Sequence, residues 1–151
     1  MAIITYNNVG ISALAACVPS RVIDNYKYNL DIFPEEDVKK VVDKIGVFER
    51  RFADDKTCSS DLCYAAAEKL ITDNNIDRSE IDLLVFVSQT PDYRMPATSI
   101  LLQERLKLPM STIAFDVNLG CSGFLYGLSN VYSFMEKQGF RKALLLDGET
   151  R

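Results

Sequence analysis

The chain has 151 residues and contains no histidine and no tryptophan. The first absence excludes a cysteine–histidine or serine–histidine pair built from this chain alone, and it removes the histidine ligands that zinc sites commonly use. The four cysteines are Cys17, Cys58, Cys63 and Cys121, and they form no C-x-x-C pair. Since neither a common zinc spacing nor a redox motif is present, we expect no metal site and no disulfide.

An excess of positive charge and a long apolar run are also missing. The 17 basic residues are outnumbered by 21 acidic ones, for a net charge of −4. Nucleic-acid binding depends on clustered lysine and arginine, so the balance argues against it, although a small basic patch for one phosphate stays open. No apolar run reaches the ~18–20 residues that span a bilayer, and the first residues lack the basic region of a signal peptide. We expect a cytoplasmic protein that binds neither nucleic acid nor membrane.

Strands and helices alternate in the hydrophobic pattern, and the length suits one globular domain. The strand patterns fall at 9–17, 81–90, 112–117 and 142–149, and 48–52 is a loop or short edge strand. The helical patterns fall at 37–44, after the capping residues Ser59 and Ser60, at 98–106 and at about 121–137. Alternation of this kind predicts an α/β fold with a mostly parallel sheet flanked by helices.

One cysteine, Cys121, occupies the junction between an expected strand and an expected helix. Groups placed after the carboxyl end of a parallel strand lie at the edge of the sheet where such folds bind ligands. A cysteine in the first turn of a helix faces unpaired N–H groups and the positive end of the helix dipole, which favour the reactive thiolate. Gly120 permits a sharp turn there, and Gly123 and Gly127 predict close packing on one face of the helix.

Taken on these grounds alone, a nucleophilic thiol and a small buried cysteine at a tight junction are equally good interpretations of Cys121. Competing motifs do not match. The hydrolase pattern G-x-(S/C)-x-G requires glycine where the chain has Leu119 or Phe124, and a G-x-G-x-x-G dinucleotide pattern is absent.

The segment "AFDVNLGCSGFLYGLSNVYSFMEKQGFRKALLLDGET" resembles the nucleophile region of the β-ketoacyl-acyl-carrier-protein synthase III group, within the thiolase-like condensing enzymes. That group carries the pattern D-(V/I)-x-x-x-C-(A/S)-G-F. It is matched in place by Asp116, Val117, Cys121, Ser122, Gly123 and Phe124. Upstream, "KIGVFERR" resembles the group's T-G-I-x-E-R segment, and "IDLLVFVSQTPDYRMPATSILLQERL" resembles its second strand, loop and helix.

The resemblance implies a fold of two similar halves. Residues 1–151 then form the N-terminal thiolase-like half-domain, a βαβαβ unit truncated before its last strand, and the C-terminal half is absent from this chain. It implies that Cys121 is the catalytic residue that takes an acyl group from a thioester. A histidine and an asparagine of the other half then promote decarboxylative condensation with a malonyl-thioester. We expect this chain alone not to complete that cycle.

The resemblance also implies the partners of the site. Coenzyme A or acyl-carrier-protein thioesters are the substrates, malonyl-carrier-protein is the second substrate, and no cofactor is needed. Met95 takes the place of an aromatic residue that reaches across a homodimer into the acyl pocket. A tryptophan that stacks on coenzyme A has no counterpart, so either coenzyme A is held differently or the primer arrives on a carrier protein. Two alternatives stay open: a non-catalytic half-subunit that pairs with another chain, and another thiolase-fold acyltransferase.

Overall fold

Residues 3–150 are described by a computed structural model, which for residues 137 and 138 shows the backbone only. They divide into a larger unit, residues 3–17 with 58–150, and a smaller unit, residues 18–57. The larger unit contains α2 (Ser59–Asp73), β3 (Ile81–Val87), α3 (Thr98–Arg105), β4 (Ile113–Val117), α4 (Gly123–Gln138) and β5 (Lys142–Asp147), and a short 3-10 turn, Arg78–Glu80. None of the helices in residues 3–150 has the length and hydropathy needed to cross a bilayer.

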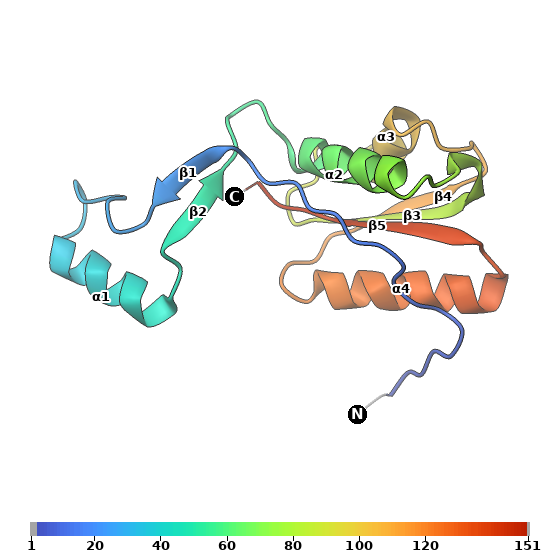
Figure 1. The fold of residues 1–151 in the computed structure, drawn as a ribbon, viewed down its shortest axis with the longest axis horizontal. Helices are drawn as coiled ribbons and strands as arrows, with labels where there is room; N and C mark the ends of the chain where they lie inside the picture. Colours follow the sequence, from blue (N-terminus) through green and yellow to red (C-terminus); the bar gives the residue numbers. More distant parts are fainter. Residues whose placement is uncertain (1–2, 151) are drawn as a thin grey trace. The chain divides into compact units, whose positions relative to one another are not determined.

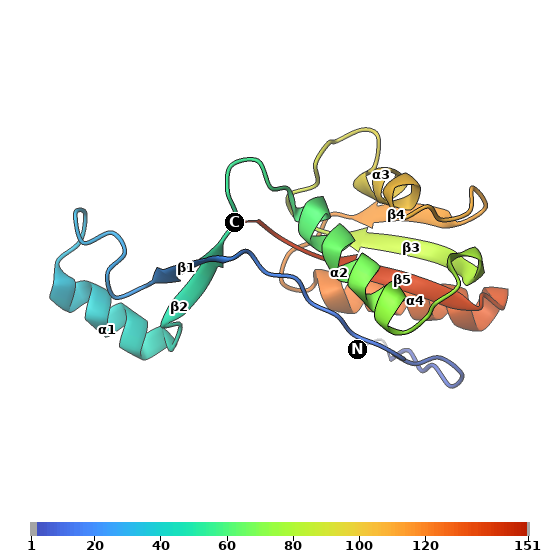
Figure 2. The same cartoon turned by 45° about the horizontal axis from the view of Figure 1, so that its top comes forward.

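Three parallel strands in the order β4-β3-β5 form the sheet of the larger unit. Leu84 of the central strand pairs with Ala114 on one side and with Leu144 on the other. Figures 1 and 2 show α2 and α3 over one face of this sheet and α4 over the opposite face. The predicted α/β architecture with a parallel sheet flanked by helices is confirmed.

The central strand β3 is covered on both faces, as its continuous apolar run predicts. Leu84 and Phe86 belong to the hydrophobic cluster with α2 and α3, whereas Leu83, Val85 and Val87 belong to the cluster with α4. All five side chains are 0% exposed. Since each fully buried side chain of this size contributes about 1.5–3 kcal/mol, β3 is the main anchor of the unit.

Glycine allows α4 to lie directly on the sheet. A methyl group added at Gly123 would come within 2.7 Å of Cγ1 of Val87, and one added at Gly127 within 2.7 Å of Cγ2 of the same residue. The second would also lie 2.9 Å from Cδ1 of Leu145. Non-bonded carbon atoms normally stay ~3.5–4.0 Å apart, so the close packing predicted from the two glycines is confirmed.

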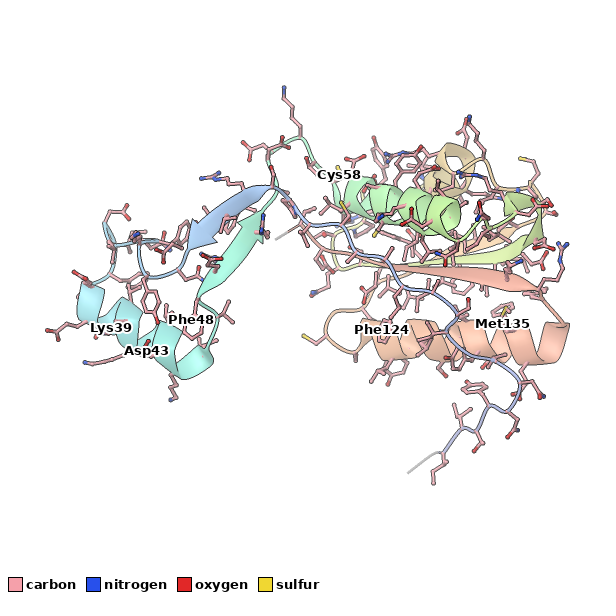
Figure 3. The ribbon with its side chains drawn as sticks, in the orientation of Figure 1. Lys39, Asp43, Phe48, Cys58, Phe124 and Met135 are labelled. Atoms are coloured by element: carbon pink, nitrogen blue, oxygen red, sulfur yellow. The ribbon has the colours of Figure 1, made fainter. Side chains whose placement is uncertain are left out.

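The smaller unit contains β1 (Arg21–Asp24), α1 (Glu35–Ile45) and β2 (Glu49–Phe52), and its two strands pair antiparallel. The helix predicted at 37–44 is confirmed, and it ends at Gly46, which has a left-handed φ of 78°. Figure 3 labels Lys39 and Asp43 on α1 and Phe48 just before β2. The guanidinium of Arg50 lies 4.4 Å above the ring of Tyr28, so cation–π contact ties β2 to the loop after β1.

The strand predicted at Val9–Cys17 is wrong for this structure, which shows an extended segment with no regular strand hydrogen bonds. The hydroxyl of Tyr6 donates to the carbonyl of Ser129 at 3.0 Å, so the start of this segment is anchored on α4. Farther along, an open cleft of about 650 Å³ separates residues 8–15 from β5. A strand forms only where its backbone finds a pairing edge, and the cleft keeps the edge of β5 out of reach.

The start of α2 also differs from expectation. The residue that precedes its first turn is Cys58, whose backbone N–H donates to the carboxylate of Asp61 at 3.0 Å. Ser59 and Ser60, predicted as caps, are buried in the first turn instead. Their hydroxyls donate to the carbonyl of Thr90 at 2.9 Å and to the carboxylate of Asp92 at 2.5 Å. The two serine hydroxyls therefore bind the loop after β3, whereas Cys58 and Asp61 cap the helix locally.

Candidate active site

Three loops meet where the parallel strands end. The loop after β3 begins at Ser88, the loop after β4 at Asn118, and the segment after β5 at Gly148. Because parallel strands present their carboxyl ends at one edge of the sheet, these loops form a common surface. Two backbone hydrogen bonds extend the strand pairing into this surface. Ser88 N–H donates to the carbonyl of Val117 at 3.3 Å, and Gly148 N–H donates to the carbonyl of Val87 at 3.1 Å.

Cys121 lies on this surface with an exposed side chain. It belongs to a tight turn in which the N–H of Gly123 donates to the carbonyl of Gly120 at 2.6 Å. The expectation that Cys121 stands inside the first helical turn is wrong by two residues, since α4 begins at Gly123. Gly120 and Ser122, which flank the cysteine, belong to this turn. The first helical hydrogen bond, from Tyr126 N–H to the carbonyl of Ser122 at 3.2 Å, follows it.

The position just before α4 still provides donors for a developing negative charge. Within residues 3–150, the backbone N–H groups of Cys121 and Phe124 have no hydrogen-bond acceptor. Such groups at a helix start favour anions because the helix dipole is positive there. The accessible thiol and the unpaired donors together suit attack on a carbonyl carbon and stabilisation of the resulting oxyanion.

The motif residue Asp116 caps a helix that lies distant from it in the sequence. Its carboxylate accepts the backbone N–H of Thr98 at 2.7 Å and that of Ser99 at 2.8 Å. These are the first two residues of α3, so Asp116 neutralises the start of that helix from the neighbouring strand. The interaction joins β4 to α3 immediately before the chain reaches Cys121.

The other cysteines occupy different environments. Burial, with the charge of Asp147 as the next cause, raises the pKa of Cys63 to about 12. Burial and the charge of Asp92 raise the pKa of Cys58, which Figure 3 labels at the beginning of α2. All four thiols are free. Because of this raised pKa, Cys63 is protonated and unreactive at neutral pH. Within residues 3–150, no group of three potential ligands is arranged to hold a metal ion.

Met95, the second site residue proposed from sequence, lies in the loop between β3 and α3, and 86% of its surface is exposed. It belongs to neither of the two hydrophobic clusters formed by the described residues. Its exposure is what a residue that meets another surface requires, and its assignment to an acyl pocket stays a prediction.

Two residues near Cys121 were missed by sequence reasoning. The side-chain amide of Gln89 lies against Gly120, where an added methyl group would be 2.8 Å from its Cδ. The carboxylate of Glu149 accepts the backbone N–H of Gln89 at 2.5 Å and the hydroxyl of Thr90 at 2.7 Å. The available signal was position, since both residues lie at the carboxyl end of a predicted parallel strand.

The chain is similar to known proteins over nearly its whole length. The 3-oxoacyl-[acyl-carrier-protein (ACP)] synthase III family matches residues 115–151. The β-ketoacyl-[acyl-carrier-protein] synthase III of Desulfitobacterium hafniense is 34% identical over 143 residues, which are 95% of this chain and 42% of that protein.

Solved structures give the same result. The 3-oxoacyl-(acyl-carrier protein) synthase of Burkholderia xenovorans is 43% identical with a TM-score of 0.82, over 87% of this chain and 38% of that one. The synthase III of Xanthomonas oryzae has a TM-score of 0.86 at 29% identity, over 96% of this chain and 44% of that one. The chain thus spans less than half the length of the relatives it matches. Over that span it is similar in sequence and in fold to β-ketoacyl-acyl-carrier-protein synthase III proteins.

Proposed function

We propose that the protein containing this chain is a β-ketoacyl-acyl-carrier-protein synthase III-type condensing enzyme whose acylated nucleophile is Cys121. The observation that carries the proposal is the exposed Cys121 thiol in the turn before α4, at the carboxyl edge of a parallel sheet. The likeness to synthase III proteins along nearly the whole chain supports it.

In the first half-reaction the Cys121 thiolate attacks the carbonyl carbon of an acyl thioester. A carbon–sulfur bond forms, and the negative charge moves onto the carbonyl oxygen, to which the N–H groups at the start of α4 donate hydrogen bonds. The original carbon–sulfur bond then breaks. The leaving thiolate takes a proton equivalent to the one that Cys121 lost, so that the products are the acyl-enzyme and a free thiol.

In the second half-reaction a malonyl-thioester loses carbon dioxide, and the electron pair left behind forms an enolate. The enolate carbon attacks the acyl carbonyl on Cys121, a carbon–carbon bond forms, and the thiolate of Cys121 leaves. Because this chain has no histidine, the groups that promote decarboxylation are assigned to a histidine and an asparagine elsewhere in the protein. The substrates are coenzyme A or carrier-protein thioesters, no further cofactor takes part, and the reaction takes place in the cytoplasm.

The homodimer that the resemblance implies belongs to the same proposal. In it the exposed Met95 of each subunit contributes to the acyl pocket of the other. A flexible methionine adapts its shape to the acyl chain better than an aromatic ring does, so this position would accommodate several chain lengths.

The proposal is tested by product formation from an acyl primer and a malonyl-carrier-protein, with the Cys121→Ser variant compared with the Cys58→Ser variant. We expect the first variant to lose condensation and the second to retain it, since Cys58 is an exposed thiol at the start of α2. Acyl transfer without a malonyl-dependent product would instead favour another thiolase-fold acyltransferase. Undiminished condensation by the Cys121→Ser variant would refute the role of Cys121.

A second candidate is a non-catalytic pairing subunit, and the surface of α4 favours it. Phe124, Leu125 and Tyr126 at the start of this helix are 41%, 66% and 59% exposed. Adjacent exposed apolar side chains mark surfaces that meet another protein. If pairing is the whole function, Leu125→Ser will convert a dimer to a monomer in sedimentation, whereas Cys121→Ser will alter neither assembly nor any enzymatic property.

A further inference from the structure

The loop after β3 is held by one carboxylate that comes from the segment after β5. One oxygen of Glu149 accepts the backbone N–H of Gln89 at 2.5 Å, and the other accepts the Thr90 hydroxyl at 2.7 Å. The carbonyl of Thr90 in turn accepts the Ser59 hydroxyl at 2.9 Å. Residues 88–90 are therefore fixed both to β5 and to the start of α2.

This fixed loop places the Gln89 side chain beside the candidate nucleophile. An added methyl group at Gly120 would lie 2.8 Å from Cδ and 3.0 Å from both Nε2 and Oε1 of Gln89, so the whole amide group covers this glycine. Gly120 supplies the carbonyl that closes the turn around Cys121. Gln89 thus occupies the space into which the turn would otherwise move.

We propose that Glu149 is a positioning residue for Cys121 and acts through Gln89. By holding the backbone of Gln89, it keeps the amide against Gly120 and fixes the orientation of the Cys121 thiol toward an acyl thioester. This inference rests on the proposed function, because it assigns the nucleophilic step to Cys121. It means that reaction at Cys121 depends on Glu149 as well as on the turn between β4 and α4.

Two substitutions of Glu149 separate the effect of its hydrogen bonds from the effect of its charge. A glutamine at 149 has the same length. Its oxygen can accept the Gln89 N–H, and its amide nitrogen can donate to the hydroxyl oxygen of Thr90. Glu149→Gln therefore retains both contacts and loses the charge, whereas Glu149→Ala loses both contacts. Glu104→Ala is the matched control, because Glu104 is an exposed glutamate on α3.

The experiment measures the rate at which Cys121 is acylated in the full-length protein by an acyl-coenzyme A or acyl-carrier-protein, followed by mass spectrometry of quenched samples. Displacement of a reacting group by about 1 Å lowers rates by up to ~10²-fold, so we expect Glu149→Ala to be acylated about tenfold more slowly. We expect Glu149→Gln to stay within about threefold of the natural protein, and Glu104→Ala to match it.

Coupling to Gln89 gives a second readout. If Glu149 acts through Gln89, then adding Gln89→Ala to Glu149→Ala slows acylation no further than the slower single variant does. Alkylation of Cys58 by iodoacetamide, measured in the same samples, should stay unchanged in every variant. A general loosening of the fold would instead also expose the buried Cys63 to the reagent.

Several results would overturn the inference. An acylation rate of Glu149→Ala equal to that of the natural protein would refute it. Equal slowing in Glu149→Gln and Glu149→Ala would assign the effect to charge. Alkylation of Cys63 in Glu149→Ala would assign it to stability. If the natural protein is not acylated at Cys121, the proposed function fails. The positioning role is then decided by whether iodoacetamide alkylation of Cys121, relative to Cys58, changes in Glu149→Ala but not in Glu149→Gln.

Discussion

Replacement of Gly127 by alanine tests the close approach of α4 to the sheet. At an open helical position, alanine is about 1 kcal/mol more favourable than glycine. In this structure the new methyl group would lie 2.7 Å from Val87 Cγ2 and 2.9 Å from Leu145 Cδ1. Both distances are shorter than a normal carbon–carbon contact by ~1 Å, and Val87 is fully buried, so a shift of its side chain must displace packed neighbours.

Overpacking of this kind costs about 1–3 kcal/mol, which exceeds the gain in helix propensity. We therefore expect Gly127→Ala to lower the free energy of unfolding by roughly 1 kcal/mol, or the melting temperature by ~2–4 °C. Circular dichroism during urea and thermal unfolding measures both quantities.

The matched control is Asn130→Ala, which changes an exposed position of the same helix whose side chain donates to the Tyr126 carbonyl within that helix. We expect it to be neutral or slightly stabilising, because alanine is the better helix former. If Gly127→Ala stabilises the protein as much as an open position would, α4 does not lie on β3 as the structure shows.

Three further outcomes follow from other contacts. Arg78 donates to both oxygens of Glu68, at 2.8 and 2.9 Å, so Arg78→Lys should lower the free energy of unfolding by about 1 kcal/mol at pH 7. The hydrogen bonds from Arg78 lower the pKa of Glu68. The stabilisation is therefore fully present above the ordinary glutamate pKa of ~4.3 and is lost as the pH falls through the lowered value. Urea unfolding at several pH values should show that the free energies of unfolding of the natural protein and of Arg78→Lys converge in acid. With its pKa raised to about 12 by burial, Cys63 should resist iodoacetamide at pH 8 until urea unfolds the protein, which peptide mass spectrometry detects. Asp116→Asn should lower the free energy of unfolding by about 1–2 kcal/mol, because an amide oxygen replaces the charged pair that accepts the first two N–H groups of α3; undiminished stability would show that this cap is dispensable.

Hydrophobic periodicity was sufficient to predict the helices and strands whose buried faces are evident within one segment of sequence. The continuous apolar run of β3 required cover on both faces, and the spacing of valines in α1, followed by Gly46, marked that helix and its end. The glycine pair in α4 correctly indicated a close neighbour. In each case the interaction that determines the structure is visible within one segment of sequence.

The errors concern pairing and turn geometry. The extended segment at Val9–Cys17 has a strand-like composition, but only a nearby edge could make it a strand. The short β1, "RVID", has no distinctive pattern and is stabilised by β2. The beginning of α4 moved by two residues because the turn around Cys121 closes through Gly120.

The candidate site was only partly predictable for a related reason. The position of Cys121 after a strand could be inferred locally, and the resemblance strengthened it. The contact between Glu149 and Gln89 joins residues separated by 60 positions, so it emerges only when two parallel strands end side by side. The local pattern of either segment contains no sign of it.

The most direct test of the central claim is to locate the acyl group after the full-length protein has reacted with an acyl-coenzyme A or an acyl-carrier-protein. Trypsin releases residues 108–137 as one peptide in which Cys121 is the only cysteine, while Cys58 and Cys63 share the peptide 57–69. The account predicts that the peptide 108–137 alone gains the mass of the acyl group, and that Cys121→Ala abolishes the gain. An acyl group on the peptide 57–69, or on neither peptide with both donors, would contradict the assignment of Cys121 as the nucleophile.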